Sequence, residues 1–219
     1  MQYEGVIFDL DGTLVDSLQD IAYSMNQVLL KNDLPQHSLE DYRYFVGGGI
    51  RNLVQKALPE DYRNDKFIST FFNDMVKVYS KHYLDQTRPY NGIEQLLDEL
   101  SIRKLKLAVF SNKTDELTKL IVAELFAKWD FKEVLGSGKD IPRKPDPTGA
   151  LYISRKLEVS SDKFIFVGDT GMDMKTAKEA GMYAVGVSWG YRDVESLKAD
   201  GADQIITNPL DLIRILDAN

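Results

Sequence analysis

The sequence predicts an α/β fold in which helices cover both faces of a parallel sheet and a helical segment is inserted near the start. From about residue 93 onward, short apolar runs alternate with amphipathic stretches, which is typical of strands and helices in a parallel sheet. A further apolar strand pattern occurs at Gly5–Asp9, and residues 16–86 separate it from that region. Because the intervening residues show helical periodicity only, the first strand is expected to join the later ones.

This pattern predicts three segments. Residues 1–15 form the first part of the sheet domain, residues 16–86 form a small helical domain, and residues 87–219 complete the sheet domain. A chain of 219 residues suits one domain with such an insertion. Pro89 and Gly92 lie near the point at which the chain is expected to return.

Within the inserted segment, apolar residues recur at spacings of three and four. Leu18, Ile21, Met25 and Leu29 predict a first long helix. A second, shorter helix begins near Ser38, Gly47–Gly49 interrupt the pattern, and two further apolar stripes follow. These helices are expected at about 17–31, 38–46, 50–58 and 67–82.

After residue 92 the predicted order is helix, strand, helix, repeated. The strands are expected at 105–111, around 133–136, and at 164–167, 183–187 and 204–206. Helices are expected at 93–103, 114–127, 147–157 and 173–180, with a closing helix after the last strand.

Composition excludes several classes of function. The net charge is −7 and no basic stripe is present, so neither nucleic acid nor an anionic membrane is an expected partner. No apolar run is long enough to span a membrane, and Met1–Glu4 does not resemble a basic secretory leader. The chain has no cysteine, which excludes disulfides and thiolate chemistry. A cytoplasmic location is the resulting expectation.

Chemically active side chains follow the predicted strands where each strand ends. The stretch "VIFDLDGTLVDS" places Asp9 and Asp11 directly after the first strand. Ligands of open parallel sheets bind beyond the carboxyl ends of the strands. The other residues expected at that edge are Ser111 and Asn112 after "LKLAVF", Lys144 in "IPRKPDP", and Asp169 and Asp173 in "FIFVGDTGMD".

Such a set is suited to phosphoryl chemistry. Two acids one residue apart repel each other, and Mg²⁺ is the hard cation that carboxylate oxygens bind well. A phosphate also needs a lysine, hydroxyl groups and backbone N–H groups around it. Asp9 is then placed to attack phosphorus, and Asp11 to protonate the leaving oxygen and later deprotonate a water.

The sequence resembles the haloacid dehalogenase superfamily of phosphohydrolases. "DLDGTLVDS", Ser111 at a strand end, Lys144 in "KPDP", and "GDTGMD" match the four motifs of that family in order. The resemblance implies a Rossmann-like core with Asp9 as nucleophile and Asp11 as acid and base. It implies that Mg²⁺ is bound by the Asp9 carboxylate, the Asp11 carbonyl and Asp169, with Asp173 in or beside this metal site. Ser111, with Asn112 next to it, and Lys144 would bind the phosphoryl group.

Within the superfamily, "FVGGGIRNLV", "SNKT", "KPDPTGAL" and "GVSWGYR" resemble phosphoglycolate phosphatases. This implies a small phosphorylated metabolite as substrate, and implies that the helical insertion is a cap, with Gly48 and Arg51 as candidates for substrate specificity. A pyrophosphatase of the same branch and a β-phosphoglucomutase-like mutase are the alternatives. The mutases usually carry a glutamate where this chain has Gly168.

A non-enzymatic phospho-acceptor module is a further alternative. Receiver domains also gather acids, a hydroxyl and a lysine around an aspartate. They are about half as long as this chain, however, and they have no helical insertion after the first strand. The oligomeric state is left open between monomer and homodimer.

Overall fold

The computed structural model describes residues 3–138 and 140–218, and the chain forms two compact units. The first, here called the sheet unit, comprises Met1–Val15 and Pro89–Asn219. The second, the helical unit, comprises Asp16–Arg88. The sheet unit is therefore built from two separate stretches of sequence, and the helical unit lies between them in the chain.

The sheet unit contains a six-stranded sheet in which every neighbouring pair is parallel. The strand order is β5-β4-β1-β6-β7-β8. This confirms the predicted parallel α/β core. The strands are β1 (Gly5–Phe8), β4 (Lys106–Thr114), β5 (Phe131–Ser137), β6 (Phe164–Gly168), β7 (Tyr183–Val187) and β8 (Gln204–Ile206).

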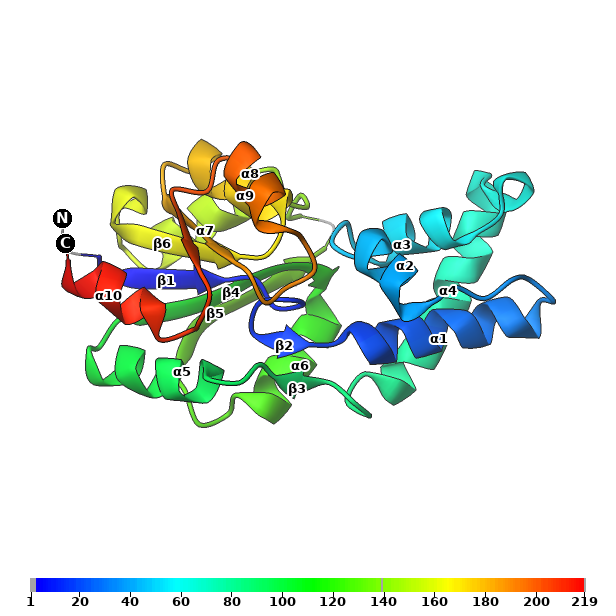
Figure 1. Cartoon of the computed structure of the whole chain (residues 1–219), viewed down its shortest axis with the longest axis horizontal. Helices are drawn as coiled ribbons and strands as arrows, with labels where there is room; N and C mark the ends of the chain where they lie inside the picture. Colours follow the sequence, from blue (N-terminus) through cyan, green and yellow to red (C-terminus); the bar gives the residue numbers. More distant parts are fainter. Residues whose placement is uncertain (1–2, 139, 219) are drawn as a thin grey trace. The chain divides into compact units, whose positions relative to one another are not determined.

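Helices connect these strands and cover both faces of the sheet (Figure 1). Side chains of α7, α8 and α9 share one apolar core with residues from one face of the sheet, such as Phe110 and Phe166. The helices α5, α6 and α10 lie on the other face (Figure 1). The helices of this unit are α5 (Ile93–Ile102), α6 (Asp115–Leu125), α7 (Thr148–Lys156), α8 (Gly171–Glu179), α9 (Val194–Ala199) and α10 (Asp211–Asp217), with a 3-10 turn at Ser161–Lys163.

The central strands are apolar on both faces because both faces are covered. In β1, Ile7 faces the core shared with α7 and α8, while Val6 and Phe8 are also fully or almost fully buried. Strands buried on both sides appear in a sequence as unbroken apolar runs rather than as an alternation. This explains why "GVIF" and "FIFV" predicted strands of the core.

The strand order reverses at β1, and this position determines where a ligand can bind. From β1 the chain continues to β4 and β5 on one side, and then returns to β6, β7 and β8 on the other. In open parallel sheets such a reversal leaves a crevice outside the carboxyl ends of the strands. Asp9 is the first residue after β1 and therefore stands at this crevice.

The helical unit is made of α1 (Leu18–Lys31), α2 (Leu39–Phe45), α3 (Ile50–Ala57), a 3-10 turn at Glu60–Tyr62 and α4 (Asp65–His82). Its core contains Met25, Tyr42 and Met75, each fully buried. Gly47–Gly49 lie between α2 and α3, and Gly49 adopts a positive φ of 80° immediately before α3. The predicted interruption of the helical pattern occurs there.

Two very short strands adjoin the ends of the helical unit. The strands β2 (Val15–Asp16) and β3 (Arg88–Pro89) pair as a separate two-stranded sheet. The sequence predicted only helices from residue 16 to residue 86, and two-residue strands are too short to show alternation. The structure also extends β4 to Thr114 and β5 from Phe131 to Ser137, beyond the predicted limits.

A buried carboxylate ties the two ends of the helical unit together. Asp20, in the first turn of α1, is 2% exposed. Its Oδ2 accepts hydrogen bonds from the backbone N–H of Thr87 at 2.8 Å and from the Thr87 hydroxyl at 2.7 Å. The N–H of Gln86 donates to both carboxylate oxygens, at 2.9 and 3.0 Å. The start of α1 is thereby joined to the residues just before β3.

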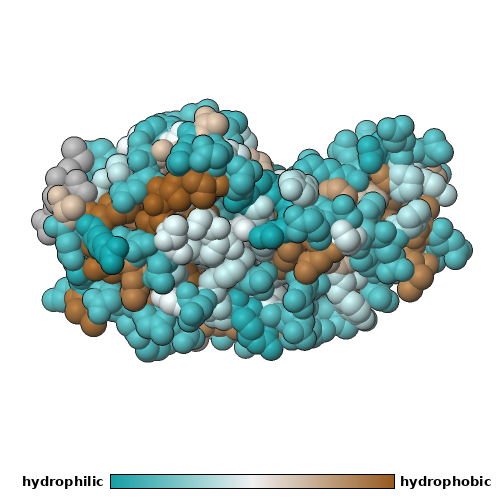
Figure 2. All heavy atoms as spheres, viewed as in Figure 1, coloured by the Kyte–Doolittle hydropathy of each residue, from teal (hydrophilic) through white to brown (hydrophobic). Residues whose placement is uncertain are grey.

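Within residues 3–138 and 140–218, no helix is both long enough and apolar enough to cross a bilayer. On the face shown in Figure 2, hydrophilic residues dominate and apolar residues appear as separate patches.

Candidate active site

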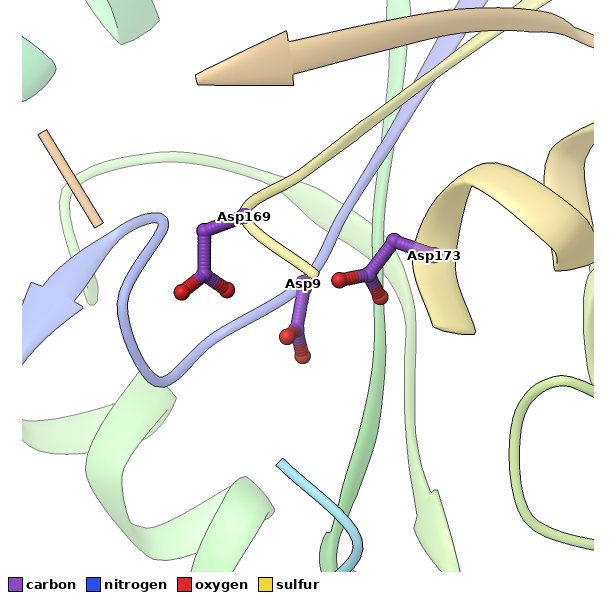
Figure 3. A group of neighbouring side chains, drawn as sticks. All are labelled: Asp9, Asp169 and Asp173. Carbon is purple, nitrogen blue, oxygen red and sulfur yellow. The ribbon is translucent and has the colours of Figure 1, made fainter. Parts of the chain in front are cut away.

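Three aspartates converge at the carboxyl edge of the sheet (Figure 3). Asp9 follows β1, Asp169 follows β6, and Asp173 lies in the first turn of α8. Each offers a carboxylate oxygen, and these oxygens all lie within 4.8 Å of one another. Asp169 and Asp173 are fully buried, and Asp9 is 7% exposed. Three acids from distant parts of the sequence therefore share one small volume.

A single buried lysine is placed between two of these acids. The Lys144 ammonium lies 2.8 Å from Oδ1 of Asp9 and 2.6 Å from Oδ1 of Asp173. It also lies 5.7 and 5.8 Å from the ring centroids of Phe110 and Phe166. The two rings add a weak cation–π attraction to the ammonium.

Asp173 also accepts hydrogen bonds at the start of α8. Its Oδ2 accepts hydrogen bonds from the backbone N–H of Thr170 at 2.9 Å and from the Thr170 hydroxyl at 2.6 Å. These contacts belong to a capping box that begins α8. Both oxygens of Asp173 are thus in use, one by the helix start and one by Lys144.

The backbone of a second loop holds Asp169. The N–H of Tyr191 donates to Oδ2 of Asp169 at 2.8 Å, and the Thr13 hydroxyl lies 3.5 Å from Oδ1. Gly12 makes this close approach possible, because a Cβ there would lie 2.3 Å from Oδ2 of Asp169 and its φ of 84° favours glycine. The turn at Gly12 therefore makes room for Asp169.

The crowding of carboxylates shifts their proton affinity. The pKa of Asp9 is raised to about 7, chiefly by burial; Lys144 opposes this rise, and the charges of Asp173 and Asp11 add to it. Burial, followed by the charges of Asp173 and Asp9, raises the pKa of Asp169 well above its ordinary value. Burial lowers the pKa of Lys144, but Asp173 and Asp9 outweigh this, and its pKa is raised. The site therefore holds more negative charge than one lysine neutralises.

This excess charge fits a divalent cation. Mg²⁺ prefers a few carboxylate oxygens together with water and phosphate oxygens. Asp9 and Asp169 are the two acids of the cluster whose carboxylates are not already shared between a helix start and Lys144. Asp173 is better suited to hold Lys144 in place beside a metal than to bind the metal itself.

Asp11 lies outside the three-acid cluster and has a different partner. Its Oδ2 is 2.9 Å from the ammonium of Lys113, whose side chain is 3% exposed. Lys113 was not among the site residues predicted from the sequence, although it occurs in "SNKT", two residues after Ser111. A lysine two residues beyond a motif serine at a strand end was the signal that could have indicated it.

Ser111 and Asn112 are both buried near the end of β4. The Ser111 hydroxyl accepts a hydrogen bond from the backbone N–H of Lys113 at 3.2 Å. The Asn112 amide contacts the backbone of Lys144 twice: its Oδ1 accepts from the N–H at 2.8 Å, and its Nδ2 donates to the carbonyl at 3.1 Å. Asn112 thus positions the lysine loop, and binding of phosphate by either residue stays a prediction.

The two residues suggested for specificity both belong to the helical unit. Arg51 donates to Asp65 at 3.1 Å and to Ser69 at 3.2 Å, which joins α3 to α4. A Cβ at Gly48 would lie 2.8 Å from the side-chain oxygen of Asn52. A substrate role for Gly48 and Arg51 stays a prediction.

Comparison with known proteins identifies the family of this chain. Residues 6–187 match the model of the family described as haloacid dehalogenase-like hydrolase. A phosphoglycolate phosphatase of Aquifex aeolicus is 33% identical over 216 residues, covering 97% of this chain and 96% of that protein. A phosphoglycolate phosphatase of Chromobacterium violaceum is 29% identical, covering 96% of each chain.

Solved structures of similar proteins have the same fold. A crystal structure from Lactobacillus delbrueckii subsp. bulgaricus superposes with a TM-score of 0.91 at 27% identity, covering 99% of both chains. A predicted phosphoglycolate phosphatase from Haemophilus somnus superposes with a TM-score of 0.89 at 29% identity, covering 98% of both.

Proposed function

Because the chain belongs to the haloacid dehalogenase-like hydrolases and is a phosphatase, we propose that it hydrolyses a small phosphomonoester through an aspartyl-phosphate on Asp9. Phosphoglycolate is the proposed substrate, since relatives that match nearly the whole chain are phosphoglycolate phosphatases. The observation that carries the mechanism is the position of Asp9: it follows the central strand, beside Lys144 and two further buried acids.

In the first half-reaction, an Asp9 oxygen forms a bond to phosphorus as the bond from phosphorus to the leaving oxygen breaks. The Leu10 N–H, at 2.7 Å, and the Lys144 ammonium both contact Oδ1 of the Asp9 carboxylate. We assign the attack to Oδ2. Asp11, as the acid, gives its proton to the leaving oxygen, which departs as an alcohol.

In the second half-reaction, the oxygen of a water forms a bond to phosphorus as the bond between the Asp9 carboxylate oxygen and phosphorus breaks. Asp11, now a carboxylate, takes a proton from that water, and inorganic phosphate leaves. Asp9 is regenerated as a carboxylate and Asp11 as an acid, so the cycle closes without a net change in the protein. Lys144 and Ser111 are proposed to contact the phosphoryl oxygens throughout.

Mg²⁺ is the proposed cofactor, and the Asp9 and Asp169 carboxylates with the Asp11 carbonyl would bind it. When bound, it supplies positive charge that neutralises the phosphoryl oxygens and orients them for in-line attack. The residues already described then keep its ligands in place: Tyr191 through its N–H to Asp169, and Asp173 through Lys144.

We also propose that the helical unit is a cap that selects the substrate, with Gly48 and Arg51 in contact with it. Replacing Arg51 with alanine then raises KM for the preferred substrate with little change in KM for a phosphomonoester that lacks a carboxylate. An equal change in both values would remove Arg51 from the proposal.

A mutase is disfavoured by the space around Gly168. A Cβ at that position would lie 2.3 Å from Cβ of Asp173. The glutamate that mutases usually carry there would therefore displace Asp173 and, with it, Lys144. Incubation with β-glucose 1-phosphate distinguishes the two, because a mutase yields an isomer without releasing phosphate.

The experiment that tests the proposal measures phosphate release with Mg²⁺ from a broad panel that includes phosphoglycolate, sugar phosphates and pyrophosphate. The parent is expected to hydrolyse phosphoglycolate best, and Asp9→Asn to lose turnover. Asp130→Asn, a change at an exposed acid, is the matched control. A panel without any hydrolysed compound, or an active Asp9→Asn variant, contradicts the proposal.

A further inference from the structure

We propose that Lys113 is a positioning residue that holds the Asp11 carboxyl group for its proton transfers and determines which of its oxygens carries the proton. The inference rests on the proposed function, in which Asp11 is the acid and base. Its basis is the ion pair in which the Lys113 ammonium lies 2.9 Å from Oδ2 of Asp11. The Lys113 side chain is 3% exposed and that of Asp11 is 19% exposed.

The backbone of Lys113 is fixed on both sides. Its N–H donates to the Ser111 hydroxyl at 3.2 Å, and its carbonyl accepts from the hydroxyls of Ser137 at 3.2 Å and Thr118 at 3.4 Å. A buried ammonium is costly unless it is paired. Lys113 therefore has a strong preference for its position against Asp11, and Asp11, which lies in the loop after β1, is held from β4.

The chemistry of the ammonium determines what this contact does. A lysine ammonium has three donors and no acceptor. Its positive charge makes the carboxylate oxygen that it contacts the less basic of the two. Oδ2 therefore accepts from Lys113 whether Asp11 is ionised or protonated, and the proton that moves to the leaving oxygen, and later comes from water, is carried on Oδ1. Such fixed orientation is a large part of the benefit of a built-in acid.

The leaving group provides a direct test. The departure of the leaving group ends the part of the reaction that kcat/KM describes, so kcat/KM is insensitive to the later hydrolysis step. An alkyl alkoxide needs a proton to depart, whereas p-nitrophenolate does not. Lys113→Met is therefore expected to lower kcat/KM for an alkyl phosphate that the parent hydrolyses by about 30-fold, which is part of the roughly 100- to 10,000-fold that general acid catalysis contributes. The loss with p-nitrophenyl phosphate is expected to stay within about threefold.

Three further variants separate positioning from a merely structural role. Asp11→Asn is expected to show the same dependence on the leaving group, and adding Lys113→Met to it is expected to cost little more. Lys113→Arg retains a donor cation and is expected to recover part of the loss. Lys119→Met, which removes an exposed lysine paired to Asp115 on α6, is the matched control and is expected to leave both values unchanged.

Equal losses on both esters, or losses that multiply in the double variant, would overturn the inference. If Lys113→Met does not fold, Lys113→Gln is judged on the same two esters by the same criterion. A parent that hydrolyses neither ester would overturn the proposed function together with this inference. An active parent with equal losses would overturn the inference about Lys113 alone.

Discussion

Both units of this chain bury aspartates, but they surround them in opposite ways. In the helical unit, Asp20 accepts four hydrogen bonds from Gln86 and Thr87, and its charge is met by donors that the fold supplies. In the sheet unit, Asp9, Asp169 and Asp173 are buried against one another with one lysine among them.

The comparison separates two meanings of a buried carboxylate. A buried charge whose oxygens are hydrogen-bonded to donors of the fold strengthens it. Buried charges of one sign weaken it, and they persist where a ligand of opposite charge or a reaction requires them. By this criterion Asp20 is structural, and the three acids of the sheet unit form a site.

The largest change in stability is expected when the lysine among the three acids of the sheet unit is removed. Lys144→Met leaves Asp9 and Asp173 without their shared partner, and breaking a buried ion pair in this way costs about 3–5 kcal/mol. Urea unfolding without Mg²⁺ is the measurement, and phosphatase activity is expected to be lost as well. Lys128→Met, at an exposed pair with Asp98, is the control. A stability equal to that of the parent would show that Lys144 does not balance the site.

The next largest change in stability is expected at Asp20 in the helical unit. Asp20→Asn keeps the size of the side chain but replaces an oxygen with an amide group that faces donors. A loss of about 2–3 kcal/mol in unfolding free energy is expected, because charged acceptors are removed from buried N–H groups. Limited proteolysis is expected to cut near residues 83–88 faster. Unchanged unfolding and cleavage would mean that the carboxylate contributes little to joining the ends of this unit.

A smaller change in unfolding free energy, this time a gain in stability, is expected at Asp169. Since burial and neighbouring acids raise the pKa of Asp169, its ionised form is costly at neutral pH. Asp169→Asn is therefore expected to stabilise the metal-free protein by about 1–2 kcal/mol while abolishing stabilisation by Mg²⁺. Thermal unfolding with Mg²⁺ and with EDTA measures both. If the variant is less stable than the parent without metal, the two kinds of aspartate do not differ as argued.

A further expected effect is a dependence of stability on pH. The folded-state pKa of Asp9 is about 7 against an ordinary value of 3.8, so between these values the folded chain holds a proton that the unfolded chain has released. Stability in EDTA therefore falls as pH rises from about 4 to about 7, relative to Asp9→Asn. The Lys144 ammonium stays charged across this range, since its pKa is raised. Parallel curves for the parent and the variant would contradict this.

The sequence was informative where chemistry and strand ends coincide. Asp9, Asp169 and Lys144 were predicted because each follows an apolar strand or lies in a proline-rich loop next to one, and parallel strands bring such ends together. The apolar runs predicted the parallel sheet for a related reason, since strands covered on both faces have no polar side.

Other features could not be predicted because they depend on which groups meet in space. Most lysines are exposed, and nothing local shows that Lys113 is buried against Asp11. The contact from the Tyr191 N–H to Asp169 uses the backbone, which every residue shares. The strands β2 and β3 have two residues each, too few for any periodicity.

The double contact between the Asn112 amide and the backbone of Lys144 has a consequence for engineering. Lys144 is held in place by this direct contact, so its position does not depend on how many residues the chain uses between α6 and β5. Extra residues inserted at the exposed turn of Ala127 and Lys128, where that path is open to solvent, should leave the ammonium at its place. Reporter peptides or affinity tags could therefore be carried there by a working catalyst.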